Sequence, residues 1–469
     1  MTAKPVTAII GAGISGLTAA KNLQDANVDF EVFEISDRVG GNWAFRNPNG
    51  YSSAYRSLHI DTSKNMLSFR DFPMSKETPT FPHHTDIHRY LEDYARTFRL
   101  YDRIHLNNGV EHAERLSSGG WRLTTQDGEI RFYDSLIVAN GHHWDARYPE
   151  FAGTFTGESI HAHEYIDPTE PLDLKGKRIV VVGIGNSGAD LVSELSQRAW
   201  QNEVYLSTRS GAWVVPKYIL GKTAEEIAKP HPAMPRALRR WVLRKLQRPL
   251  LGNPEDFGLP TPNHDFGEAH PTQSAELLMR LAAGDATAKP NIDHFEGRTV
   301  HFADGTAVEA DVVIYATGYN ITFPFFDPEF ISAPDNSISL YKRMFKPGME
   351  DLIFIGFAQA VPTLFPFVEC QSRVAAAYLQ GNYQLPDLDQ MQRTIAEDEA
   401  LHIGNAPATA RHTQQVDYYD YVRDIERHEL PAGRLRAQQA SPTDLLRRRP
   451  PSAASVEAAD SMRAESIAS

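Results

Sequence analysis

Short apolar runs, each followed at once by glycines, dominate the pattern of hydrophobic and polar positions along the chain. The first run covers residues 6–10 and leads directly into a glycine-rich turn, residues 11–16. Apolar residues then recur at helical spacing over residues 17–23, and a second apolar run, residues 30–33, ends at Glu34. Continuous apolar runs of this length are typical of buried parallel strands. The pattern therefore predicts a strand, a tight turn, a helix and a second strand.

The same pattern returns in the middle of the chain. An apolar run over residues 177–182 precedes a glycine-rich turn at residues 183–190, a helix to about Arg198 and a strand over residues 203–207. Each copy is also followed by an Asp-Gly pair, another Asp and an apolar run that ends in glycine. These sets are Asp127-Gly128, Asp134 and residues 135–141, then Asp304-Gly305, Asp311 and residues 312–318. Asp-Gly pairs favour hairpin turns, so the repeat predicts two related dinucleotide-binding units, each with a β-meander and a returning strand.

The first turn has the properties that a bound dinucleotide requires. Gly11 allows the tight turn, Gly13 leaves room for a pyrophosphate, and Gly16 lets the helix pack closely on the strand. The N-terminus of that helix faces the phosphates. Glu34 lies at the distance where a carboxylate can accept hydrogen bonds from an adenosine ribose. The first unit is therefore predicted to bind FAD.

The corresponding strand tip in the second copy lacks the carboxylate. It carries Thr208 and Arg209 instead. A carboxylate would repel a 2′-phosphate, whereas a cation and a hydroxyl bind one. The second unit is therefore predicted to bind NADPH.

Composition narrows the class of protein. The chain has 469 residues, of which 41% are hydrophobic, and this length suits about two to three domains. Its single cysteine, Cys370, excludes an intramolecular disulfide and favours a reducing compartment, so we expect a cytoplasmic protein. No signal peptide or membrane-length apolar run is visible. The net charge of -13 argues against nucleic acid as a partner.

Two helices are predicted outside the repeated units. Residues 85–99 form the first, with Thr85 as its cap. His83, His84 and His88 lie near its start, but no further Cys or His completes a metal site, so we expect no metal. The second is a basic amphipathic helix over residues 235–246, which suits a lid better than a membrane anchor.

The predicted fold class is α/β, with two Rossmann-like dinucleotide-binding domains, the NADPH domain being inserted into the FAD domain. A strand over residues 351–356 and a helix near Pro366, whose N-terminus can point at a flavin, return the chain to the first unit. The predicted limits are residues 1–170 and 319–440 for the FAD domain, 171–318 for the NADPH domain with a helical insertion at about 224–290, and 441–469 for a disordered tail.

A stretch before the second turn makes the pattern specific. It carries Phe155, Gly157, His161 and Tyr165 at the spacing F-x-G-x3-H-x3-Y. Together with both glycine turns and residues 316–319, it resembles the flavin-containing monooxygenases, which bind FAD and NADPH. The related Baeyer–Villiger enzymes usually have Trp at the position of Tyr165.

The resemblance implies an activity. NADPH reduces the flavin, O2 then gives a C4a-(hydro)peroxyflavin, and a soft N or S atom of a small organic substrate takes one oxygen atom. A homodimer is a possible assembly, and no nucleic acid or membrane partner is expected. Asp61 and His161 are the implied catalytic residues. The implied cofactor-binding residues are Gly11, Gly13, Ile14, Ser15, Gly16, Glu34, Arg38, Gly41, Asn42, Trp43, Asp61, Thr62, Val110, Gly183, Gly185, Asn186, Ser187, Gly188, Ala189, Asp190, Thr208, Arg209, Thr317, Gly318, Gly356 and Gln371.

The chain departs from the family at Asp61, where many members have an Asn that supports the oxygenated flavin. An Asp cannot donate a hydrogen bond unless it is protonated. Two alternatives therefore stay open: Baeyer–Villiger oxidation of ketones, which Tyr165 opposes, and an NADPH oxidase that releases H2O2, which Asp61 favours. A pyridine nucleotide-disulfide reductase needs a dithiol that one cysteine cannot supply. A flavin-binding module without catalysis would have no use for the second cofactor site.

Overall fold

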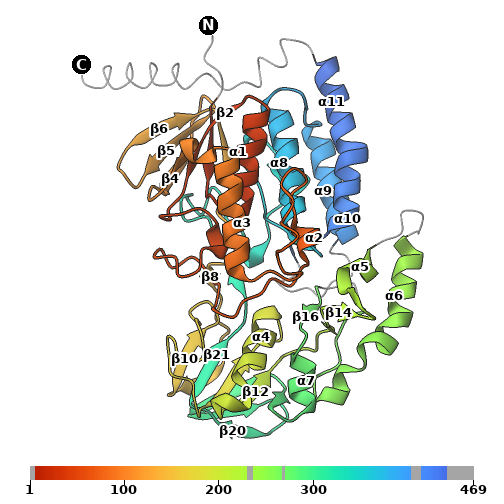
Figure 1. Cartoon of the computed structure of the whole chain (residues 1–469). Coiled ribbons are helices and arrows are strands. Elements are labelled where there is room, and N and C mark those ends of the chain that lie inside the picture. Colours follow the sequence, from red (N-terminus) through yellow and green to blue (C-terminus); the bar gives the residue numbers. More distant parts are fainter. Residues whose placement is uncertain (1–5, 230–235, 267–269, 403–412, 441–469) are drawn as a thin grey trace.

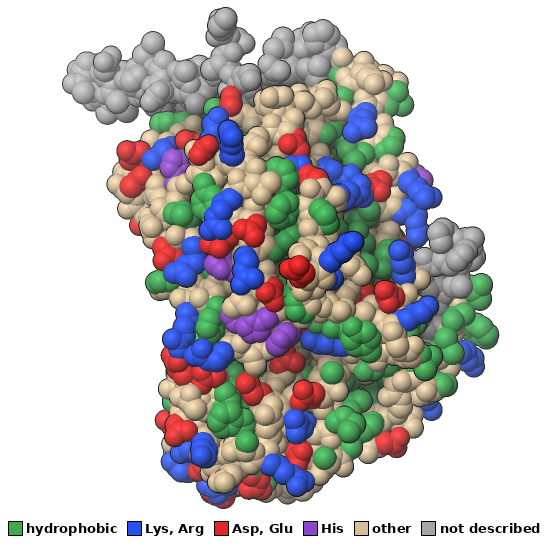
Figure 2. All heavy atoms as spheres, in the orientation of Figure 1, with side chains coloured by type: hydrophobic (Ala, Val, Ile, Leu, Met, Phe, Trp, Pro, Cys, Tyr) green, Lys and Arg blue, Asp and Glu red, His purple; other side chains and the backbone are tan. Residues whose placement is uncertain are grey.

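The computed structural model describes residues 6–229, 236–266, 270–402 and 413–440, which form two stacked lobes (Figure 1). The predicted tail, residues 441–469, lies outside the described residues. Asp and Glu side chains are interspersed with Lys and Arg over the face seen in Figure 2. Within the described residues, no helix is long and apolar enough to cross a membrane.

The upper lobe is built on a sheet in the order β23-β24-β7-β1-β2-β3. Its strands are β1 (Val6–Ile10), β2 (Asp29–Phe33), β3 (Ile104–His105), β7 (Ser135–Val138), β23 (Phe345–Lys346) and β24 (Met349–Phe354). All neighbours are parallel except β23 and β24. Helix α1 (Ile14–Asp25) packs against α8 (Phe365–Leu379), with α3 (His84–Thr97) beside it (Figure 1). The central strands are buried on both faces, which explains their continuous apolar runs.

The lower lobe repeats this plan with an all-parallel sheet in the order β10-β21-β11-β12-β17. Its strands are β10 (Glu158–His161), β11 (Arg178–Val182), β12 (Glu203–Ser207), β17 (Ala286–Lys289) and β21 (Val312–Tyr315), with helices α4 (Asn186–Leu195) and α7 (Leu277–Ala282). The chain thus leaves the first sheet after β7 and returns to it with β23. The domain limits stay a prediction, and β10 pairs in the second sheet although residue 170 was the expected boundary.

The two predicted Asp-Gly hairpins are confirmed. Gly128 and Gly305 have φ values of 81° and 79°. The Gly128 turn joins β5 (Trp121–Thr125) to β6 (Ile130–Tyr133), in a sheet with β4 (Val110–Arg115). The Gly305 turn joins β19 (Thr299–Phe302) to β20 (Ala307–Glu309), in a sheet with β9 (Ala152–Phe155) and β18 (Ile292–Gly297). The repeated acids have the same structural role, because Asp134 accepts a hydrogen bond from the Val6 N–H (2.8 Å) and Asp311 accepts one from the Arg178 N–H (2.9 Å).

An insertion in the lower lobe extends towards the upper lobe. Its first part, residues 214–228, is called the arm below. The arm contains β13 (Val214–Val215), β14 (Tyr218–Ile219), β15 (Lys222–Thr223) and α5 (Ala224–Ala228). Helix α6 (Arg236–Leu251) and β16 (Thr272–Gln273) follow. The predicted basic helix is therefore present, as the first part of α6.

Smaller elements complete the upper lobe and the connection between lobes. They are α2 (Lys64–Leu67), β8 (Asp145–Ala146), β22 (Tyr319–Asn320), β25 (Gln359–Val361), α9 (Leu388–His402), β26 (Gln415–Asp417), α10 (Tyr418–Asp424) and α11 (Leu430–Gln439).

Two predicted helix ends were wrong. The cap of α3 is His83 rather than Thr85, because a His83 ring nitrogen accepts the Thr85 N–H. Helix α4 stops at Leu195 rather than near Arg198, because Asn202 donates a side-chain hydrogen bond to the Leu195 carbonyl (3.0 Å).

Candidate functional site

A mostly apolar cavity of about 950 Å³ lies between the lobes. The carboxyl end of β1, the start of α4, the arm and α6 all contribute to its wall. The predicted site residues in this wall are Gly11, Gly13, Ile14, Ser15, Glu34, Gly41, Asn42, Trp43, Asp61, Thr62, Val110, Asn186 and Gly356. Residues predicted from distant parts of the sequence therefore meet in one cavity.

The first glycine turn leaves an open edge on this cavity. Gly11 has a φ of 99°, and a Cβ on Gly16 would lie 1.8 Å from the Gly11 carbonyl oxygen, so the turn and the helix need both glycines. A Cβ on Gly13 would clash with no protein atom, since its nearest neighbour is the Gly41 Cα at 3.6 Å. Gly13 is therefore open on the side where a ligand can approach the backbone.

Glu34 is held rigidly beside this turn. Its carboxylate accepts hydrogen bonds from the Ala12 N–H (2.6 Å) and the Ser36 N–H (2.9 Å), and its side chain is buried. Burial raises the pKa of Glu34, and the two N–H groups partly offset this shift. Each carboxylate oxygen keeps a second lone pair, so Glu34 can still accept hydrogen bonds from a ligand.

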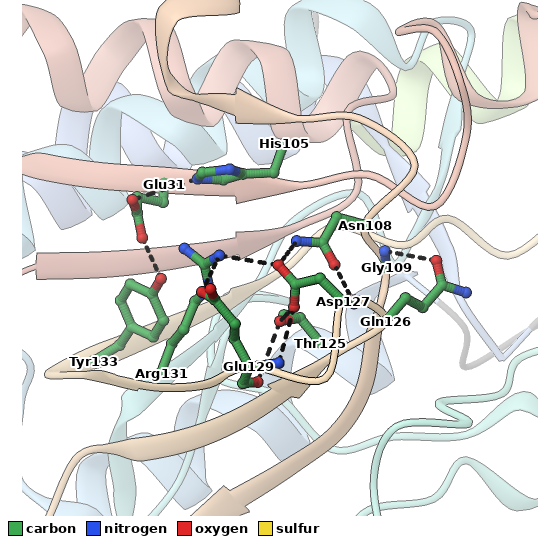
Figure 3. A network of polar contacts seen from close by, with 10 residues as sticks. All are labelled: Glu31, His105, Asn108, Gly109, Thr125, Gln126, Asp127, Glu129, Arg131 and Tyr133. Carbon is green, nitrogen blue, oxygen red and sulfur yellow. Dashed lines mark hydrogen bonds and ion pairs between the residues drawn. The ribbon is translucent and has the colours of Figure 1, made fainter.

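A polar network fixes the neighbouring part of the cavity wall (Figure 3). Asp127 accepts hydrogen bonds from Asn108 (2.7 Å) and Thr125 (2.6 Å), and the Gln126 side chain accepts the Gly109 N–H (3.0 Å). The hairpin turn at Asp127 therefore holds the loop that brings Val110 to the cavity. Asp127 is a positioning residue that the repeat indicated only as a turn.

The second glycine turn has almost the same backbone as the first. Gly183 has a φ of 110°, and a Cβ on Gly188 would lie 1.9 Å from the Gly183 carbonyl oxygen. The strand tip differs, because Arg209 is exposed and pairs with no carboxylate of the described residues. Thr208 is buried and donates its hydroxyl to the Ser210 carbonyl (2.6 Å).

Arg147 adds a second cation to this region. Its guanidinium donates to the Thr317 carbonyl (3.3 Å), and its backbone N–H donates to the Gly318 carbonyl (3.0 Å). Burial lowers the pKa of Arg147, and the nearby charge of Arg209 lowers it further. Two guanidiniums therefore lie near each other at the ends of β12 and β21, an arrangement that suits a phosphate. No pattern in the sequence pointed to Arg147, because it follows a strand outside the second repeated unit.

Asp61 belongs to a partly buried group of charges between the lobes. Its Oδ1 lies 3.4 Å from the Nζ of Lys217 in the arm. Tyr55 donates its hydroxyl to Asp190 on α4. Burial raises the pKa of Asp61, the nearby Asp190 raises it further, and Lys217 opposes both. Asp190 therefore contacts Tyr55 of the upper lobe and does not contribute to the cavity wall.

His161 lies at the end of β10, outside the cavity wall, and is 1% exposed. Its ring stands between Tyr148 (5.3 Å) and Tyr319 (5.4 Å), and its Nδ1 accepts the His163 N–H (3.1 Å). Burial lowers the pKa of His161 to about 4. A neutral, buried ring at this place suits a residue that holds the connection between the lobes.

Other predicted residues also lie outside the cavity wall. Gln371 is fully buried, and its side-chain oxygen accepts the Gly356 N–H (2.9 Å), so it acts on the wall through Gly356. Arg38 pairs with its neighbour Asp37 at the surface. The remaining ones are Gly16, Gly183, Gly185, Ser187, Gly188, Ala189, Asp190, Thr208, Arg209, Thr317 and Gly318.

Sequence reasoning missed several residues of the cavity wall. His142 and His143 lie in the cavity wall, four and five residues after the end of β7, and burial lowers the pKa of His142. Their place after a parallel strand was the available signal, because ligands bind at such strand ends. Glu225, in the arm, had no signal in the sequence. Its Oε1 accepts the Ser63 N–H (2.7 Å).

A family model described as flavin-binding monooxygenase-like matches residues 3–430. Dimethylaniline monooxygenase (N-oxide-forming) 2 of Rattus norvegicus is 33% identical over 441 residues, which cover 89% of this chain and 81% of the relative.

Solved structures share the fold at low identity. S-allyl-L-cysteine S-oxygenase from Allium sativum has a TM-score of 0.68 and 22% identity, with 92% of this chain and 89% of that chain covered. The protein OTEMO, in complex with FAD and NADP, has a TM-score of 0.69 and 18% identity, with 91% and 98% covered.

Proposed function

Because the chain belongs to the flavin-binding monooxygenase-like family, we propose that it transfers one oxygen atom of O2 to a soft N or S atom of a small, largely apolar substrate. The chain is a flavin-dependent monooxygenase, and FAD and NADPH are its cofactors. When bound, the reduced flavin activates O2 and supplies the oxygen atom.

The residues at the first turn fit FAD. The open side of Gly13 leaves space for a pyrophosphate, and Glu34 keeps lone pairs for the hydroxyls of a ribose. At the second turn, Arg209 offers a cation that pairs with no carboxylate of the described residues, and Arg147 offers a second one near it, on which the charge of Asp335 also acts. This pair of cations favours the 2′-phosphate of NADPH. We assign these roles as part of the proposal, together with the insertion of the NADPH domain into the FAD domain.

The observation that carries the proposal is the mostly apolar wall of the cavity, to which both lobes contribute residues. Beyond the Asp61–Thr62 segment, its substrate side is lined by Ile219, Val242, Leu250 and Phe266. Such a wall excludes water from the reacting atoms and binds apolar molecules without selecting for one polar group. The chain's own residues therefore orient the substrate and keep the site dry, and no side-chain nucleophile is required.

The test supplies NADPH and ¹⁸O2 to the purified protein with a tertiary amine, a thioether or a ketone of similar size. Incorporation of one labelled atom into the amine or thioether, at about one NADPH per product, is the expected result. A labelled ester from the ketone alone would assign the protein to Baeyer–Villiger oxidation instead. Consumption of NADPH with H2O2 as the only product from all three would overturn the proposal.

A further inference from the structure

Two residues of the arm, Lys217 and Glu225, make polar contacts with the chain segment that carries Asp61. The Nζ of Lys217 lies 3.4 Å from the Asp61 Oδ1 and 3.4 Å from the Ile60 carbonyl oxygen. Eight residues later, the Glu225 carboxylate accepts the Ser63 N–H at 2.7 Å. Figure 1 shows α5 and β14 of the arm where the lower lobe meets the upper, close to α2. The arm therefore contacts residues 60–63 at both ends of this segment.

The contact of Glu225 with Ser63 is well shielded from water, and that of Lys217 with Asp61 is partly shielded, since these two side chains are 18% and 22% exposed. Glu225 is 4% exposed and Ser63 is 2% exposed. The Lys217 ammonium also lies over the Phe81 ring, 5.2 Å from its centroid, and Phe81 packs edge-on against Tyr218 of the arm. Hydrogen bonds and ion pairs in such surroundings are stronger than at the surface, and loss of one partner leaves the other unsatisfied.

The opposite side of residues 60–63 is held by the upper lobe itself. The Ile60 N–H donates to the Pro82 carbonyl (2.9 Å), and the Thr62 hydroxyl donates to the Pro362 carbonyl (2.9 Å). Among the described residues, the groups of the lower lobe that act on this segment come from the arm and from α4. Movement of the lower lobe would therefore act on Asp61 through these groups.

We propose that Lys217 and Glu225 are positioning residues for the oxygen transfer, which hold residues 60–63 against the cavity and set the charge that Asp61 carries. The inference rests on the proposed function, because it takes Asp61 as the group beside the reaction centre. Lys217 stabilises the ionised form of Asp61, and Glu225 fixes the backbone on which Asp61 is mounted.

The charged groups around Asp61 define what a pH measurement reports. Asp190 on α4 and Lys217 in the arm act on Asp61 directly. Tyr55 acts on it indirectly, because its hydroxyl donates a hydrogen bond to Asp190. Glu194 and Glu276 act on Asp190. Asp190 favours protonated Asp61 and Lys217 favours ionised Asp61, so removal of Lys217 keeps Asp61 protonated to a higher pH.

The first test measures the ratio of H2O2 to oxygenated product against pH in the FAD-loaded protein. Lys217→Met is expected to move the midpoint of this profile upward by about one pH unit. Lys222→Met is the matched control, because Lys222 is an exposed lysine of the same arm. Equal midpoints in all three proteins would overturn the proposal.

A second measurement does not depend on oxygen chemistry. The difference in melting temperature between wild type and Lys217→Met is expected to be small at low pH, where Asp61 is protonated in both. It should grow as the pH rises and Asp61 ionises. The same comparison in an Asp61→Asn background should show a smaller growth, because only the effect of Lys217 on Asp190 remains there. A growth as large as in the wild-type background would overturn the coupling of Lys217 to Asp61, whether or not the protein oxygenates any substrate.

Glu225 is tested by a pair of variants. Glu225→Gln keeps an oxygen that can accept the Ser63 N–H, whereas Glu225→Ala removes it. The ratio of H2O2 to oxygenated product is expected to rise in Glu225→Ala and to return to the wild-type value in Glu225→Gln. Equal ratios in both variants at equal FAD content would remove Glu225 from the proposal.

Discussion

The two glycine turns of the molecule share a backbone but differ in the chemistry at the adjoining strand tip. Gly11 and Gly183 have φ values of 99° and 110°. Each turn ends in a glycine, Gly16 or Gly188, where the Cβ of any other residue would clash with a carbonyl oxygen. At the first tip, Glu34 is buried and already bonded to two backbone N–H groups. At the second tip, Arg209 is exposed and has no carboxylate partner among the described residues.

This difference suits two cofactors with different tasks. A buried, rigid acceptor at the first tip favours a cofactor that stays bound. An exposed cation at the second tip favours a charged cofactor that must enter and leave during turnover, because charge attracts it without enclosing it. The predictions below test this contrast, beginning with the largest expected effect.

Gly13→Val should abolish FAD binding while the protein still folds. A Cβ at this position meets no protein atom closer than 3.6 Å, and the Val methyl groups would extend into the space left for the pyrophosphate. Flavin absorbance per chain is expected to fall by more than about tenfold, with an unchanged circular dichroism spectrum. The corresponding Gly185→Val variant should keep FAD but lose reduction by NADPH. Loss of FAD from both variants would contradict the separation of the two sites.

Arg209→Ala should weaken NADPH binding selectively. Loss of a charge-assisted contact to the 2′-phosphate costs about 1.5–3 kcal/mol, or roughly 10- to 150-fold in affinity. NADH affinity should stay unchanged, because NADH lacks that phosphate. Dissociation constants for both nucleotides provide the measurement. An equal loss for NADPH and NADH would show that Arg209 is not the phosphate ligand.

Arg147→Met should act in the same direction with a smaller effect, because the Arg147 guanidinium also bonds the Thr317 carbonyl. We expect roughly a three- to tenfold loss of NADPH affinity. The double variant with Arg209→Ala tests whether both residues act on one phosphate. Additive losses in the double variant would indicate two independent sites.

Asp61→Asn should lower the ratio of H2O2 to oxygenated product by roughly three- to tenfold at neutral pH. An ionised carboxylate in a dry site repels developing negative charge, whereas an amide can donate a hydrogen bond. FAD content should not change, since the residue lies at the cavity wall and not at the glycine turn. An unaltered ratio would mean that Asp61 has no part in oxygen transfer.

His161→Asn should change turnover and the pH dependence of stability. The lowered pKa of His161, about 4, means that folding favours the neutral ring. Its contribution to stability is therefore present above the unfolded value near 6.5 and is lost as the pH falls towards 4. Melting temperatures should fall less steeply from pH 7 to pH 5 in the variant. A lowered melting temperature with normal turnover would make His161 a purely structural residue.

The sequence alone determined the two turns and the chemistry at their strand tips. Glycine positions, apolar runs and the Asp-Gly repeat depend on local backbone geometry and on burial of whole strands, which a linear pattern records directly. For this reason Gly11, Glu34 and Arg209 could be predicted, and the repeated Asp134 and Asp311 proved structurally equivalent.

Only the tertiary structure decided which side chains from distant segments meet. Lys217 approaches Asp61 across 156 positions (217 minus 61), and Glu225 reaches the Ser63 N–H across 162. Arg147 likewise lies near Arg209, because β8, the strand that precedes Arg147, pairs with β22. No periodicity encodes such contacts, because they depend on how the insertion and the two sheets pack together. The charged groups that surround Asp61 are therefore a property of the folded chain.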